Sequence, residues 1–224
     1  MLRSVSDIVS DVRMCIDELG LDESQFVGGT EDAEFEDVIK SKIEDALRYV
    51  YLNGSLDVLE FTWMKGEASV SDKKHVDIPL PANLLRLCVV NVDGWPPMYK
   101  AIRGEDREYM MLKNPITTGY PDNPKMAIVT KAYAAVMPTS EDGGISESTN
   151  NVLELYGYPD NDGTPYLVAY MPEPSKVNEQ YDIPAKAYRG VVYYTAGLTL
   201  LTYKDAHADA LMNQAISLIG AKIN

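Results

Sequence analysis

The sequence predicts an α+β fold with helices at both ends of the chain and a β-rich middle. Apolar residues recur at helical spacing near both termini, whereas the middle contains short β-branched and aromatic runs bounded by proline and glycine. Sequential strands joined by short turns favour antiparallel pairing, which indicates α+β rather than α/β. We therefore expect a single composite domain, with a helical core from residues 1–55 and 182–224 and a β-rich insertion from residues 56–181.

A first helix is predicted over residues 4–19. Ser4 and Asp7 form a capping-box pattern at its start, and Gly20 is a typical residue for its end. Its apolar face comprises Ile8, Val9, Val12, Ile16 and Leu19.

A second helix is predicted after an acidic linker over residues 21–30. We expect Thr30 to cap it, because acidic residues follow directly, where the helix dipole favours them. Gly54 is expected to end it. Its buried stripe is predicted to comprise Phe35, Val38, Ile39, Ile43, Ala46, Leu47 and Val50.

The middle of the chain is predicted to form strands separated by polar turns. Asp93-Gly94 indicates a hairpin turn, after which Pro96 and Pro97 favour an edge position or a bulge. Strands are expected over residues 56–64, 75–80, 84–92, 95–102 and 126–137, and one helical turn is expected over 103–109. Loops are expected over residues 65–74, 114–124 and 140–151, and the loop over 140–151 is expected to be the most mobile.

Residues 152–156 and 167–171 are two apolar runs on either side of a turn-rich segment. Asn161, Asp162 and Gly163 tolerate positive φ, so the chain can reverse there. We therefore expect these two runs to pair as a hairpin.

The chain beyond this predicted hairpin is expected to be helical. Pro172 and Pro174 stop the second strand, and Asp182 and Pro184 are typical of a helix start. Gly197 in this helix indicates a close packing contact. Whether residues 201–207 bend the helix or continue it is left open. Residues 206–219 continue in helix-favouring sequence. The expected buried face comprises Tyr188, Val191, Val192, Thr195, Leu198 and Thr199.

Charge and cysteine content limit the classes of function. The net charge of −14 argues against a protein that neutralises nucleic-acid phosphates, and suits one that repels polyanions or meets a basic partner. Cys15 and Cys88 lie among apolar residues, so we expect two buried free thiols in a reducing compartment. The N-terminus lacks the pattern of a signal peptide, and no apolar run approaches a membrane span, so we expect a cytoplasmic product.

Residues suited to catalysis are sparse in the sequence. His75 and His207 are the only histidines, and isolated histidines are more often surface residues than parts of one site. The segment 160–163 resembles a turn more than a calcium loop, and no phosphate-binding loop or nucleophile motif occurs. We predict no enzyme activity, no catalytic, metal-binding or cofactor-binding residue and no cofactor. The acidic pairs are interpreted as solvated surface: Asp17-Glu18, Asp22-Glu23, Glu31-Asp32, Glu36-Asp37 and Glu44-Asp45.

The aromatic residues indicate protein–protein contacts. Tyrosine occurs 15 times and phenylalanine 3 times, and tyrosine suits half-buried surfaces with a polar tip. Trp95 is interpreted either as an exposed anchor at a hairpin tip or as a ring folded back over the sheet. The predicted interface residues are Trp63, Trp95, Tyr99, Tyr156, Tyr181 and Tyr188.

The order of elements resembles that of the head–tail adaptor proteins of short-tailed bacteriophages, above all the ring proteins of crAss-like phages. The resemblance rests on the strand–turn–strand segment with its proline stop and Tyr-led helix, together with residues 77–87 (DIPLPANLLRL) upstream. It implies a homo-oligomeric ring of about twelve copies, docked to the phage portal and to other tail or ring proteins, through which genomic DNA passes without specific binding. The expected location is the virion, assembled in the bacterial cytoplasm, with no membrane partner.

Two other hypotheses remain open at this point. The acidic charge also fits a binding module of the DNA-mimic type, which would occupy a basic nucleic-acid-binding protein. A hydrolase with a carboxylate-bound metal would need acidic residues that converge from different elements.

Overall fold

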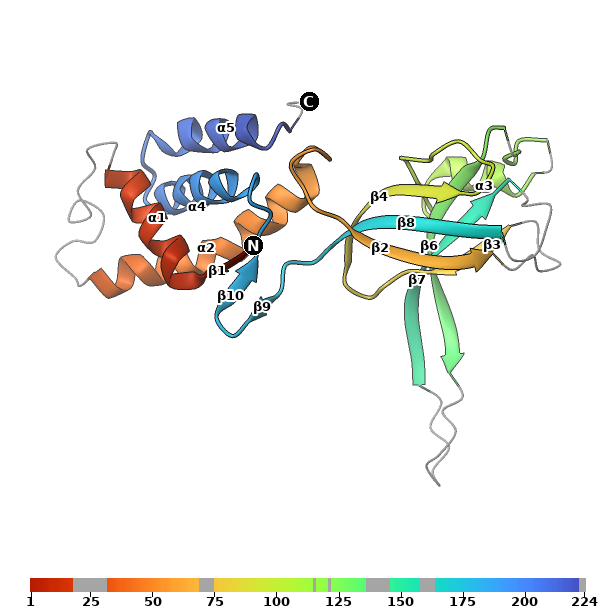
Figure 1. The fold of residues 1–224 in the computed structure, drawn as a ribbon, viewed down its shortest axis with the longest axis horizontal. Coiled ribbons are helices and arrows are strands. Elements are labelled where there is room, and N and C mark those ends of the chain that lie inside the picture. Colours follow the sequence, from red (N-terminus) through yellow and green to blue (C-terminus); the bar gives the residue numbers. More distant parts are fainter. Residues whose placement is uncertain are drawn as a thin grey trace, which may run out of the picture. The chain divides into compact units, whose positions relative to one another are not determined.

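The computed structural model describes residues 1–17, 32–68, 75–114, 116–120, 122–135, 146–157 and 164–221. In this part of the chain, five helices and three sheets form the α+β fold that the sequence predicts (Figure 1). Helices occupy the two ends of the chain and most strands its middle. Four features of the sequence prediction lie outside the described residues: Gly20, the linker over residues 21–30, Thr30 as the cap of the second helix, and the turn at 160–163.

The chain divides into two compact units. The helical unit is Met1–Glu60 with Glu173–Asn224, and the sheet unit is Phe61–Pro172. The expected limits of the insertion were residues 56 and 181. The segment after Pro172 belongs to the helical unit because strand β1 (Leu2–Ser4) pairs with β10 (Gln180–Asp182), which in turn pairs with β9 (Lys176–Val177).

Helix α1 (Val5–Asp17) begins with the predicted capping box. The Asp7 backbone N–H donates to Ser4 Oγ at 3.1 Å, and the Ser4 backbone N–H donates to Asp7 Oδ2 at 3.3 Å. Hydrogen bonds that the Ser4 side chain and the Ser4 backbone N–H donate to the Asp7 carboxyl lower its pKa. The predicted apolar face is confirmed at four of its positions, since Ile8, Val9, Val12 and Ile16 are buried.

Ser4→Ala should destabilise the helical unit by about 0.5–2 kcal/mol, because it leaves an N-terminal N–H of α1 without its side-chain acceptor. Urea unfolding measures the change. Ser10→Ala is the control: Ser10 is exposed within the same helix, where alanine has the higher propensity, so this change should be neutral or slightly stabilising. Equal losses in the two variants would contradict the role of the cap.

Helices α2 (Asp32–Asn53), α4 (Tyr188–Thr202) and α5 (Ala208–Leu218) complete the helical unit. Helix α4 packs against the other three helices. The close contact predicted at Gly197 is confirmed, because a Cβ there would lie 2.5 Å from Met212 Cγ. The predicted stripe of α2 is buried except at Val38, which is partly exposed. The helical core comprises Ile8, Val12, Ile16, Phe35, Ile39, Ile43, Leu47, Val50, Val191, Ala196, Leu200 and Ala215.

The start of the C-terminal helix differs from the prediction. Asp182 belongs to β10, where its carboxylate accepts a hydrogen bond from the N-terminal ammonium of Met1, and it does not cap a helix. The Pro184 carbonyl accepts hydrogen bonds from the next turn, and α4 begins at Tyr188. The question left open over residues 201–207 is resolved as a break, in which Lys204 has a φ of 59°.

The sheet unit contains two sheets that share one core (Figure 1). In the first, β8 (Thr164–Pro172) lies between β2 (Thr62–Ala68) and β4 (Leu84–Val92). The second has the order β3 (Val76–Pro79), β7 (Ser146–Tyr156), β6 (Lys125–Ala135) and β5 (Ile102–Arg103), and only β5 and β6 are parallel. The shared core comprises Val76, Ile78, Leu80, Val90, Val92, Met98, Met126, Leu153, Leu155 and Val168.

The predicted hairpin of residues 152–156 with 167–171 is wrong. These runs lie in β7 and β8, which are inner strands of different sheets and do not pair with each other. An inner strand has neighbours on both sides and a face in the core, so it is apolar whichever strand it pairs with. The two apolar runs therefore indicate buried strands without identifying their partners.

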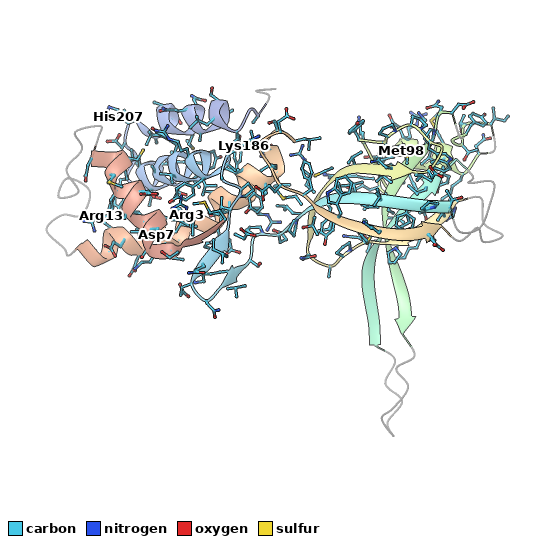
Figure 2. All side chains as sticks on the ribbon, in the orientation of Figure 1. Arg3, Asp7, Arg13, Met98, Lys186 and His207 are labelled. Atoms are coloured by element: carbon cyan, nitrogen blue, oxygen red, sulfur yellow. The ribbon has the colours of Figure 1, made fainter. Side chains whose placement is uncertain are left out.

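Several predicted boundaries also need correction. The strand expected from residue 56 begins at Thr62, and it continues through part of the predicted 65–74 turn to Ala68. Residues 146–151 of the predicted mobile loop belong to β7. The strand expected over residues 95–102 is reduced mainly to a bridge between Val90 and Met98, next to Pro96 and Pro97. Figure 2 labels Met98. The helical turn expected over 103–109 is α3 (Arg107–Leu112).

Candidate functional site

The most distinctive feature of the sheet unit is a two-stranded extension of β6 and β7. These strands pair from Lys125 with Tyr156 to Ala135 with Ser146. The neighbouring strand β3 pairs with β7 only as far as Val152, and β5 pairs with β6 only at residues 127 and 128. We define residues 131–135 and 146–150 as the β arm, where no other described strand pairs with either one. Figure 1 shows the arm running away from the two sheets.

An ionic cluster holds the base of the β arm. Lys131, the first arm residue of β6, places Nζ 2.8 Å from Asp77 Oδ2 on β3 and 2.6 Å from Glu154 Oε1 on β7. Tyr109 and Tyr156 donate hydrogen bonds to Glu154 Oε2, at 2.9 Å and 2.7 Å. We call His75, Asp77, Tyr109, Lys131, Glu154 and Tyr156 the arm-base cluster.

Glu154 is the buried centre of this cluster, with a side chain only 3% exposed. Burial alone would raise the pKa of this carboxyl, but hydrogen bonds from Lys131, Tyr156 and Tyr109 outweigh burial and lower it. Burial would likewise lower the pKa of Lys131, yet its bonds to Asp77 and Glu154 raise it. The geometry therefore keeps both groups charged and ties the arm to the sheet.

His75 completes the cluster without an ordinary hydrogen bond. Its Nε2 lies 3.1 Å from Asp77 Oδ1 and 3.4 Å from Glu154 Oε1. Nevertheless, Nε2 and Asp77 Oδ1 are both buried atoms without a hydrogen-bond partner among the described residues, because their short separation lacks hydrogen-bond angles. His207, the other histidine, lies in the helical unit, where Nδ1 is 2.9 Å from Asp205 Oδ1 (Figure 2).

The predicted aromatic interface residues of the sheet unit occupy different environments. Trp63 is 49% exposed and Tyr99 is 63% exposed, so both are available for contacts in the single chain. Trp95 has folded back over the sheet, since it packs on the shared core and a Cβ at Gly157 would lie 2.7 Å from its ring. Tyr156 is buried and bound to Glu154.

The two predicted aromatic residues of the helical unit are engaged within that unit. Tyr181 is buried in the small β1–β10–β9 sheet. Tyr188 donates a hydrogen bond to Asp11 Oδ2 at 2.5 Å, and the Arg3 guanidinium lies 4.3 Å from its ring centre. Their positions favour stabilising roles inside the helical unit.

An exposed apolar surface at α3 was not predicted from the sequence. Met110 and Met111 of α3 are 67% and 53% exposed, and Ile116 and Tyr120 of the following loop are 80% and 52% exposed. Tyr120 donates a hydrogen bond to the Ile116 carbonyl at 3.0 Å, which connects the two loop residues. We call these four residues the α3 patch. Exposed apolar side chains gathered in one segment are typical of a protein contact site.

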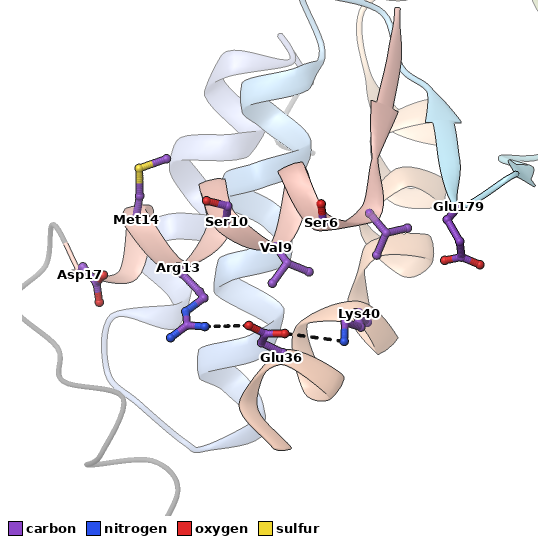
Figure 3. A pocket seen from close by; sticks show the side chains of 10 residues that line it. Ser6, Val9, Ser10, Arg13, Met14, Asp17, Glu36, Lys40 and Glu179 are labelled. Carbon is purple, nitrogen blue, oxygen red and sulfur yellow. Dashed lines mark hydrogen bonds and ion pairs between the residues drawn. The ribbon is translucent and has the colours of Figure 1, made fainter. Parts of the chain in front are cut away.

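The helical unit carries an open groove of about 670 Å³ beside α1 and α2 (Figure 3). Arg13 Nη1 lies 2.7 Å from Glu36 Oε1, and Lys40 Nζ lies 3.7 Å from Glu36 Oε2. Met14, 53% exposed, adds an apolar edge. The lining therefore includes an ion-pair network of Arg13, Glu36 and Lys40.

The two cysteines are buried free thiols, as the sequence predicts. Burial raises the pKa of the Cys88 thiol, which disfavours the reactive thiolate.

Comparisons with known proteins add no relative: no family model matches the chain, and no curated protein matches it. None of the described helices combines the length and apolar character needed to cross a bilayer.

Proposed function

We propose that this chain is the subunit of a head–tail connector ring in a short-tailed bacteriophage. Copies would close into a ring through contacts between two different surfaces of each subunit. The ring would dock to the portal and extend the DNA channel toward the tail, as the resemblance to crAss-like phage ring proteins implies. The β arm is the observation that carries this proposal.

The β arm has the properties of an assembly element. A two-stranded ribbon is marginally stable in water, and its outer edges present unpaired backbone N–H and C=O groups. The arm-base cluster fastens its Lys131 end. A neighbouring subunit in a ring would supply partners for these edges, which supports a contact of the arm with the next copy.

Exposed apolar side chains supply further contact surfaces. The α3 patch, Trp63 and Tyr99 all lie in the sheet unit and remain exposed in the single chain. Aromatic and methionine side chains are enriched at protein interfaces. These residues therefore support contacts with neighbouring copies, the portal or other tail proteins.

The distribution of charge supports a role beside DNA. The helical unit carries the larger share of the net negative charge. Asp37, Glu44 and Asp45 are exposed along α2. An acidic surface repels DNA phosphates, so DNA would slide past it without binding. We infer that this face of α2 is directed toward the channel.

Co-sedimentation with purified cognate portal rings tests this function. We expect the full chain to sediment with the portal and to reach a fixed stoichiometry. The major capsid protein of the same phage is the control, and it should not retain the chain. A chain that stays in the supernatant at every portal concentration would contradict the proposal.

Met110→Ser combined with Ile116→Ser should weaken assembly on the portal roughly tenfold or more, since each removes an exposed apolar contact worth about 1 kcal/mol. Titration followed by sedimentation measures the shift. Leu201→Ser is the control, because Leu201 is also exposed, at 50%, but lies in α4. An equal effect from both changes would argue against a specific role for the α3 patch.

A further inference from the structure

We propose that the arm-base cluster binds a divalent transition-metal ion through His75 Nε2, Asp77 Oδ1 and Glu154 Oε1. This site is independent of the connector function and was not predicted from the sequence. The three donor atoms come from the start of β3 and from β7, and all lie within 4.8 Å of one another.

The spacing of the donor atoms fits one shared ion. Ligand bonds of about 2.0–2.1 Å in a tetrahedral zinc site place neighbouring donor atoms about 3.3 Å apart. His75 Nε2 lies 3.1 Å from Asp77 Oδ1 and 3.4 Å from Glu154 Oε1. These two separations match edges of such a tetrahedron, and the two carboxylate oxygens lie within 4.8 Å of each other, so one ion can reach the imidazole and both carboxylates.

Two of the donor atoms form no hydrogen bond with any described residue, although they lie 3.1 Å from each other. His75 Nε2 and Asp77 Oδ1 are buried without a hydrogen bond among the described residues. An unsatisfied buried polar group destabilises a protein, so such atoms usually have a role. A metal ion would satisfy both atoms at once.

The groups around the donors hold them in place. Tyr109 and Tyr156 bind Glu154 Oε2, which leaves Oε1 directed at His75. The Tyr156 ring also lies against the His75 ring, with 5.2 Å between their centres. Outer hydrogen bonds that orient the ligands in this way are a regular feature of metal sites.

Lys131 competes with the ion for one of the three donors. Its ammonium binds Asp77 Oδ2, which leaves Oδ1 available, but it also binds Glu154 Oε1. The Lys131 side chain is 27% exposed, so it can turn toward solvent when an ion binds. Removal of its charge should therefore strengthen metal binding.

The donor set selects the class of metal. Imidazole together with carboxylates suits Zn²⁺ and Co²⁺, whereas Mg²⁺ and Ca²⁺ favour oxygen ligands alone. Magnesium should therefore compete poorly at this site.

Calorimetric titration of the EDTA-treated full chain with Zn²⁺, supported by the visible spectrum of bound Co²⁺, tests the proposal. We expect one ion per chain, with binding weakened at least tenfold by His75→Ala and by Asp77→Asn, which keeps the side-chain volume. Lys131→Met should bind more tightly, and Zn²⁺ should raise its melting temperature. Far-UV circular dichroism verifies that each variant is folded.

His207→Ala is the matched control, because His207 has only one carboxylate partner, Asp205, among the described residues. It should bind as the wild type does. The proposal is overturned if the wild type binds no ion at 100-fold molar excess, if His75→Ala binds as tightly as the wild type, or if only Lys131→Met binds. In the last case the ammonium excludes the ion from the natural site.

Discussion

Replacement of residues 132–149 by an Asn-Gly turn should abolish assembly on the portal and leave the fold of the sheet unit intact. Lys131 and Asn150 lie opposite each other in the β6–β7 register, so a two-residue turn can join them. The arm-base cluster retains all of its residues in this variant. The strands β3 and β5 also keep their partners, because they pair closer to the body of the sheet.

The melting temperature of this shortened chain provides the control. It should stay within a few degrees of the wild-type value, since the arm lies outside the pairing of the other strands. Sedimentation with portal rings then measures assembly. Normal assembly of the folded, shortened chain would show that the β arm is not needed for the ring.

Lys131→Met should lower the free energy of unfolding by about 2 kcal/mol at pH 7 in the absence of metal. Breaking a fully buried ion pair costs about 3–5 kcal/mol, and the effect here is smaller because Lys131 is 27% exposed. Urea unfolding measures the change. Lys40→Met, which removes exposed contacts with Glu36 and Asp37, is the control and should change stability by less than about 1 kcal/mol.

The pH dependence of the free energy of unfolding should differ between the wild type and Lys131→Met. In the wild type the pKa of Glu154 is lowered from 4.5 in spite of burial, so its stabilising contribution is present above pH 4.5 and is lost as the pH falls through the lowered value. Without Lys131, the strongest of the interactions that lower this pKa is lost, so the pKa of Glu154 should lie higher than in the wild type. The deficit of Lys131→Met should then shrink between pH 7 and pH 4, as Glu154 becomes neutral. A constant deficit across this range would contradict the role of the ion pair.

Local signals in the sequence were sufficient where one segment determines the structure. The Ser4–Asp7 capping box follows from residues close together in the chain, and the Gly197 contact joins α4 to α5, the next helix along the chain. The predicted pairing of β7 with β8 was wrong because the partner of each strand depends on the whole sheet unit. The boundary of the units was displaced for the same reason, since β1 and β10 pair across nearly the full length of the chain.

The arm-base cluster was missed because its members come from separate elements. Asp77, Lys131 and Glu154 lie on β3, β6 and β7, and only the register of the strands brings them together. A signal was nevertheless present: Glu154 interrupts the apolar run of residues 152–156. A charged residue inside a buried strand needs a partner, so this position could have been identified as a polar site. The exposed residues of the α3 patch had no comparable signal, because short loop segments show no periodicity.

The native mass of the chain, measured by light scattering alone and with a cognate portal ring, tests the connector function most directly. We predict a complex on the portal that contains a fixed number of copies, about twelve if the chain follows the proteins it resembles. Unchanged masses of the chain and the portal after mixing would contradict the proposal. The acidic surface would then direct the search to a basic nucleic-acid-binding partner.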